Sequence, residues 1–113
     1  MFETIRIETD ARGVARLTLA RAAKHNTLSA KMIEELTQAA HLLGGDPHVR
    51  VVVLAAEGDS FCAGGDLGWM QAQIAGDALV RRAGATALAT MLRTLDTLPK
   101  PLIGRVQGPA YGG

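Results

Sequence analysis

The 113-residue sequence has a single cysteine, few aromatic residues and no strong excess of either charge. The lone Cys62 rules out an intrachain disulfide and any cysteine cluster, so we expect no metal site. Cys62 is interpreted as a small buried filler, with a nucleophile as the alternative, because no histidine lies beside it. With aromatic residues at 4%, the core must be built from Val, Leu, Ile and Ala.

The charge balance and the hydropathy pattern exclude several kinds of partner. The net charge is +1, and no Lys/Arg cluster is interleaved with aromatic residues, so we expect no nucleic acid partner. No apolar run is long enough to span a bilayer, and the first residues do not have the pattern of a signal peptide. We therefore expect no membrane association and a cytoplasmic location. A hydrophobic fraction of 48% excludes a disordered chain and allows one modest core.

The first half of the sequence predicts two strands, a helix and a third strand. Apolar and polar residues alternate over 2–8 and 14–19, and turn residues at 10–13 separate them, so a hairpin is expected. Ser29 is a candidate N-cap for a helix. Apolar residues recur at helical spacing after it: Met32, Ile33, Leu36, Ala39, Ala40 and Leu43. The apolar run 49–56 predicts a central strand buried on both faces.

The second half predicts two helices and a last strand. A short helix is expected over 67–74, and Asp77 caps a longer one that Pro99 ends. One face of the longer helix is predicted to carry Val80, Ala87, Leu88, Met91, Leu95 and Leu98. The run 101–106 predicts a strand, followed by a Gly-rich turn at 108–113. We find no linker, repeat or low-complexity stretch.

A first Gly-rich turn, within residues 60–70, follows the central strand and leads into the short helix. The small residues Ala63, Gly64 and Gly65 would let a ligand approach the backbone, and the N–H groups of a first helical turn are unpaired donors. Such a turn can hold an anion or a carbonyl oxygen that becomes anionic. The alternative is a tight connection with no ligand. The spacing fits neither the dinucleotide fingerprint nor the P-loop.

Three segments carry a resemblance to a known family. Phe61–Leu67 (FCAGGDL) resembles the F-x-A-G-x-D-[LI] signature of the enoyl-CoA hydratase/isomerase (crotonase) family. Arg21–Leu28 (RAAKHNTL) resembles its R-P-x-K-x-N-A-L segment, and Pro99–Gly113 resembles its K-P-x-I-A-x-[VI]-x-G-x-A-x-G-G segment. The three segments stand in the family's order. The resemblance covers the whole chain, but only about the first half of such a domain.

The resemblance implies an α/β fold, the crotonase-like ββα spiral, of which residues 1–113 would be the N-terminal part, truncated after the second oxyanion-hole turn. It implies an acyl-CoA thioester substrate, so that coenzyme A enters as part of the substrate and no separate cofactor is expected. Backbone N–H groups of Gly65 and Gly113 would hold the thioester carbonyl and stabilise an enolate. A role in fatty acid metabolism and a homotrimer or hexamer are expected for a full-length family member.

The resemblance also implies the residues that contact the substrate. They are Ala23, Lys24, His25, Ala63, Gly64, Asp66, Leu67, Tyr111 and Gly112. Lys24 suits a phosphate of the coenzyme, although it and His25 could equally be ordinary exposed loop residues. Asp66 is better explained as a helix cap than as a catalyst, because an uncapped carboxylate there would oppose an enolate. Trp69 and Met70 either line the acyl channel or pack in the core.

The sequence departs from the family's pattern in ways that bear on activity. Ala22 and Thr27 replace the usual proline and alanine, and Gly65 stands where many members have alanine, which leaves a backbone donor intact. The acid/base glutamates of the family's hydratases lie beyond Gly113. We therefore expect an enoyl-CoA hydratase by resemblance, a lyase, whose 113-residue chain alone has weak or no turnover. Alternatives are an isomerase or another crotonase-family reaction, a non-catalytic CoA-binding remnant or assembly fragment, and a generic α/β domain with accidental motifs.

Overall fold

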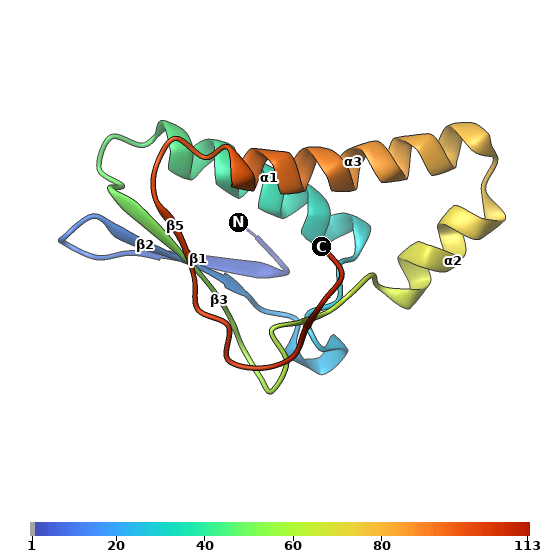
Figure 1. Cartoon of the computed structure of the whole chain (residues 1–113), viewed down its shortest axis with the longest axis horizontal. Helices are drawn as coiled ribbons and strands as arrows, with labels where there is room; N and C mark the ends of the chain where they lie inside the picture. The colour runs from blue at the N-terminus through green and yellow to red at the C-terminus, as the bar shows by residue number, and fades with distance from the viewer. Residues whose placement is uncertain (1) are drawn as a thin grey trace.

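A computed structural model describes residues 2–113 as one sheet with three helices and a small second sheet (Figure 1). The large sheet has the order β1-β2-β3-β5, with strands β1 (Ile5–Thr9), β2 (Val14–Leu19), β3 (Val51–Ala56) and β5 (Leu102–Gly104). The helices are α1 (Ala30–Gly45), α2 (Leu67–Ala75) and α3 (Ala78–Asp96), with a 3-10 turn η1 (Ala22–Lys24). Strands β4 (Cys62–Ala63) and β6 (Ala110–Tyr111) form the second sheet.

The predicted hairpin is confirmed, and α1 connects it to a parallel strand. β1 and β2 are antiparallel, with Ile5 opposite Leu19. The turn between them is closed by Asp10, whose carboxylate accepts the N–H of Arg12 at 2.8 Å. β3 is parallel to β2, and β5 is parallel to β3. The crossover from β2 to β3 runs through α1, as a parallel pair requires.

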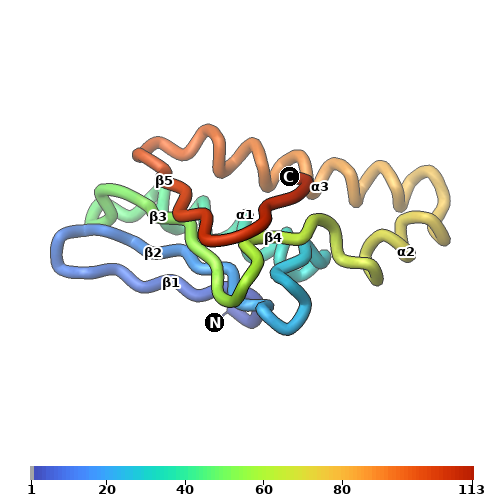
Figure 2. Tube along the Cα trace, turned by 60° about the horizontal axis from the view of Figure 1, so that its bottom comes forward, coloured from blue at the N-terminus to red at the C-terminus, as the bar shows by residue number. Residues whose placement is uncertain are grey.

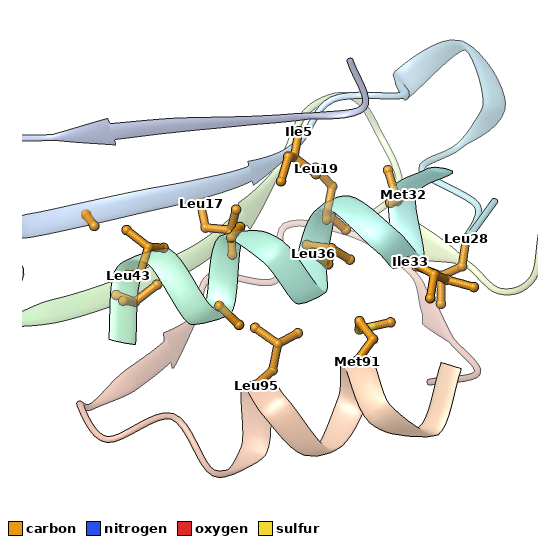
Figure 3. Packing of buried hydrophobic residues seen from close by; sticks show 14 of the residues in the cluster. Ile5, Leu17, Leu19, Leu28, Met32, Ile33, Leu36, Leu43, Met91 and Leu95 are labelled. Carbon is orange, nitrogen blue, oxygen red and sulfur yellow. The ribbon is translucent and has the colours of Figure 1, made fainter. Parts of the chain in front are cut away.

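Helix α1 lies between the sheet and α3, and its apolar side forms the centre of the core (Figure 3). Ser29 caps the helix as predicted, because its Oγ accepts the N–H of Met32 at 3.2 Å. All the residues predicted for its apolar face are buried. From α3, Met91 and Leu95 point toward α1 and are 1% and 8% exposed.

Two predictions about burial are wrong in part. In β3, Val52 and Ala55 are buried, but Val51 and Val53 are only half-buried, because α1 covers a single face of the sheet. In α3, the C-terminal half is packed as predicted, whereas Val80 and Ala87 are exposed. The N-terminal half of α3 extends past the end of α1 toward α2 (Figure 1). Among residues 2–113, no helix has the length and apolar character needed to cross a membrane.

Candidate active site

The two Gly-rich turns lie side by side, because the short strands β4 and β6 that enter them are paired. The pairing is parallel and sets Ala63 opposite Tyr111. One residue further, the two backbones lie close together: a Cβ built on Gly112 would lie 3.4 Å from the Cα of Gly64. Both glycines have positive φ, 96° at Gly64 and 74° at Gly112. Figure 2 shows the C-terminal segment running beside β4.

Gly65 and Gly113 are the residues that follow Gly64 and Gly112 in the two turns. On its other side, the first turn is held by two hydrogen bonds, from Leu28 N–H to Gly64 O at 2.8 Å and from Asp66 N–H to Leu28 O at 2.9 Å. Within residues 2–113, neither the Gly65 N–H nor the Gly113 N–H has a hydrogen-bond acceptor. The site therefore presents two unpaired backbone donors on neighbouring turns.

Asn26 holds the loop before α1 against the loop that leads into β4. Its side chain is fully buried. Its Oδ1 accepts the N–H of Arg21 at 2.8 Å, and its Nδ2 donates to the carbonyls of Glu57 at 2.8 Å and Ser60 at 3.0 Å. The sequence predicts no role for Asn26, because a polar residue in a polar loop carries no local pattern that indicates burial.

Arg21 and Asp66 link the same loop to the start of α2. The Arg21 guanidinium lies 3.3 Å from the Asp66 carboxylate, with both side chains mostly buried, and also donates to Thr27 O at 2.7 Å. Asp66 caps α2 as predicted, because its Oδ2 accepts the N–H of Trp69 at 3.0 Å. That hydrogen bond, opposed by burial and supported by Arg21, holds the pKa of Asp66 below its ordinary value.

The remaining predicted site residues lie around these turns, most of them exposed. Ala23 and Lys24 are exposed on η1, and His25 follows in a left-handed conformation with φ of 54°. The carbonyl of His25 accepts the N–H of Ala63 at 3.1 Å, which places the loop beside β4. Leu67 and Tyr111 are exposed. Cys62 is buried, as expected of a filler.

An apolar cavity of about 570 Å³ lies between α2 and α3. Its lining is Trp69, Met70, Gln73, Ile74, Arg81, Ala85, Leu88, Ala89 and Leu92. Trp69 also packs against the core. Met70 is 41% exposed, so the interpretation of Met70 as a core residue is wrong. Four further cavity residues were not predicted from the sequence, although their helical spacing is a usable signal: Ile74, Ala85, Ala89 and Leu92.

The cavity begins beside both candidate glycines. A Cβ on Gly65 would lie 3.1 Å from Met70 Sδ, and one on Gly113 would lie 3.2 Å from Leu92 Cδ1. In Figure 2 the C-terminus ends against α3. The unpaired donors and the apolar lining therefore belong to one site, which can receive a polar group attached to an apolar chain.

Comparison with solved structures identifies the class of protein that this fold defines. The chain is similar to an enoyl-CoA hydratase from Shewanella pealeana, with a TM-score of 0.94, 35% identity, and coverage of 98% of this chain and 42% of that chain. It is also similar to Pseudomonas aeruginosa AtuE, with a TM-score of 0.88, 33% identity, and coverage of 95% and 41%. The predicted crotonase-like fold is thus confirmed.

The family follows from the sequence match. The family model described as enoyl-CoA hydratase/isomerase matches residues 9–113, and the chain belongs to this family. A curated relative, the probable enoyl-CoA hydratase echA6 of Mycobacterium bovis, is 36% identical over 104 residues, which are 92% of this chain and 39% of the relative. The chain thus spans about two fifths of the length of such relatives. Family membership excludes a generic domain with accidental motifs.

Proposed function

We propose that this chain binds an acyl-CoA thioester and holds its carbonyl oxygen with the N–H groups of Gly65 and Gly113. The observation that carries the proposal is the pair of unpaired amides on neighbouring turns at the start of an apolar cavity. Chemistry beside a thioester passes through an enolate, and preorganised amides favour that charge. In other oxyanion holes, removal of one donor costs roughly 3–4 kcal/mol.

The same geometry suggests how the rest of the substrate would lie. The acyl chain would enter the cavity between α2 and α3, where Trp69 and Met70 form part of the wall. The coenzyme would leave toward η1, where the exposed Lys24 ammonium suits a mobile phosphate. The other proposed contacts with the substrate are Ala23, His25, Ala63, Gly64, Asp66, Leu67, Tyr111 and Gly112.

The reaction proposed for the full-length protein is hydration of a 2-enoyl-CoA, a lyase reaction, in a homotrimer or hexamer. This reaction needs a general acid and base beside the carbonyl. In this chain the carboxylate that adjoins Gly65 is Asp66, and it already binds Trp69 N–H and Arg21. We therefore propose that glutamates beyond Gly113 supply the acid and base, and that these 113 residues alone have weak or no turnover. The same oxyanion site would equally serve an isomerase.

A second candidate is a protein that binds CoA thioesters without chemistry, which the engagement of Asp66 favours for this chain. Calorimetric titration with a short 2-enoyl-CoA, followed by a hydration assay on the same sample, tests the proposed binding site and the expected lack of turnover. Micromolar binding with negligible hydration is the expected result for the 113 residues. Robust hydration would contradict the proposed absence of an acid/base pair, and no binding would contradict the proposed site.

A further inference from the structure

A negatively charged carboxylate lies one residue after a proposed oxyanion donor. Asp66 directly follows Gly65, and consecutive Cα atoms are about 3.8 Å apart. The hydrogen bond from Trp69 N–H, opposed by burial and supported by Arg21, holds the pKa of Asp66 below its ordinary value, so this carboxylate is ionised at neutral pH. Without a compensating cation, its charge would raise the free energy of an enolate oxygen bound at the Gly65 N–H.

Arg21 supplies the compensating cation. Its Nη2 lies 3.3 Å from Asp66 Oδ1, and its Nη1 donates to Thr27 O at 2.7 Å, so the guanidinium is held at both ends. The two side chains are only 19% and 20% exposed, and water and salt therefore screen this pair less than an ion pair on the surface. Within residues 2–113, each of the two is the other's only ion-pair partner.

The other titratable side chains of the segments around the first turn are exposed, apart from the buried Cys62 thiol of β4 and Glu57, which is paired with Arg6. The exposed groups come from η1 and the residue after it, the start of α1, the loop before β4, and β6: Lys24, His25, Lys31, Asp59 and Tyr111. Water screens their charges. The balance within the mostly buried pair of Arg21 and Asp66 therefore acts most directly on an oxygen at Gly65.

We propose that Arg21 is a positioning residue of the oxyanion site: it neutralises Asp66, so that the turn can cap α2 with a carboxylate and still accept a negatively charged oxygen at the Gly65 N–H. Arg21 acts through Asp66 and does not touch the substrate. The proposal rests on the proposed function, since it places the enolate oxygen at Gly65. It follows that loss of Arg21 disfavours a bound enolate much more than a bound neutral thioester.

Acetoacetyl-CoA, a 3-oxoacyl thioester, is a suitable probe, because the carbon between its two carbonyls loses a proton readily and the resulting enolate absorbs in the near ultraviolet. The measured quantity is the apparent pKa of the probe bound to the 113-residue chain, taken from absorbance against pH. In Arg21→Met this pKa should rise by about one unit, because the Asp66 carboxylate is left uncompensated. In Asp66→Asn it should fall by about one unit, because Arg21 then has no counter-charge.

Two further variants separate charge compensation from damage to the fold. The double variant Arg21→Met/Asp66→Asn should return the pKa of the bound probe close to the parent value, and Arg21→Lys should keep most of it. Arg12→Met is the matched control, because the exposed Arg12 pairs with Asp10 at 2.7 Å in the turn between β1 and β2. That turn lies at the opposite end of the molecule from α2 (Figure 1), so no shift is expected.

The outcomes separate this proposal from the proposed function. A bound probe with the same pKa in the parent, Arg21→Met and Asp66→Asn would overturn the role of Arg21 and leave the acyl-CoA site standing. A double variant shifted further than Arg21→Met would also overturn it, because structural damage adds whereas opposite charges cancel. If circular dichroism shows Arg21→Met unfolded, the direction of the shift in Asp66→Asn decides. Failure of the probe to bind the folded parent chain would overturn both proposals.

Discussion

Replacing Asn26 by alanine should be among the most damaging single changes in this chain. The substitution leaves one buried N–H and two carbonyls without the partner that Asn26 supplies. Each lost hydrogen bond costs about 1 kcal/mol net, and more where the remaining group is buried and unsatisfied. Because Ser60 O keeps a second donor, Gln107 Nε2 at 3.2 Å, the sum is about 3–4 kcal/mol.

The left-handed backbone at Asn26 adds a separate conformational free-energy cost to the substitution. A substitution at the neighbouring His25 measures a cost of this kind. His25 has the same φ of 54° but is exposed, and its side chain makes no hydrogen bond within residues 2–113. His25→Ala therefore reports only the conformational cost, about 1 kcal/mol or less. Urea unfolding followed by Trp69 fluorescence gives both free energies of unfolding. If Asn26→Ala destabilised the fold no more than His25→Ala, the hydrogen bonds of Asn26 would not be what joins the loops.

Three further predictions concern other contacts. Lys100→Met should lower the free energy of unfolding by about 1–2 kcal/mol, because the Lys100 ammonium binds the carbonyl of Leu43 near the end of α1; an unchanged urea midpoint would contradict this. The folded pKa of Asp66 lies below its ordinary value of 3.8, so its stabilising effect is complete above that value and is lost as the pH falls through the folded pKa. Asp66→Asn should therefore flatten the stability curve below about pH 4, and parallel curves for variant and parent would refute the assignment. Gly112→Ala should cost about 1 kcal/mol, because the φ of 74° is unfavourable with a side chain whereas the 3.4 Å contact with Gly64 is tolerable; equal thermal midpoints would contradict it.

The elements with a strong local signal could be predicted from the sequence. Alternation over the first two strands and the helical spacing from Met32 to Leu43 each match the face that the fold buries. For α3 the same kind of spacing predicted a buried face that includes Val80, yet Val80 is exposed. Periodicity identifies an apolar face but not the element that covers it. The prediction that β3 is buried on both faces is wrong in part for the same reason, because no element within residues 2–113 covers its second face.

The candidate site depended on features that sequence patterns do not carry. Strands β4 and β6 are two residues long, too short for any periodicity, yet their pairing brings the Gly-rich turns together. The expectation that Gly65 and Gly113 act together came from the family resemblance and not from local propensity. Asn26 was missed because its burial depends on carbonyls more than thirty residues away in the sequence.

The central claim is that the N–H groups of Gly65 and Gly113 share one thioester carbonyl. The most direct test is a ¹H–¹⁵N correlation spectrum of the 113-residue chain, with these two amides assigned, during titration with a short 2-enoyl-CoA. Both amide protons should move together and downfield with one dissociation constant, because each gains an acceptor. Saturable binding that shifts other residues and leaves both glycine amides in place would contradict the claim.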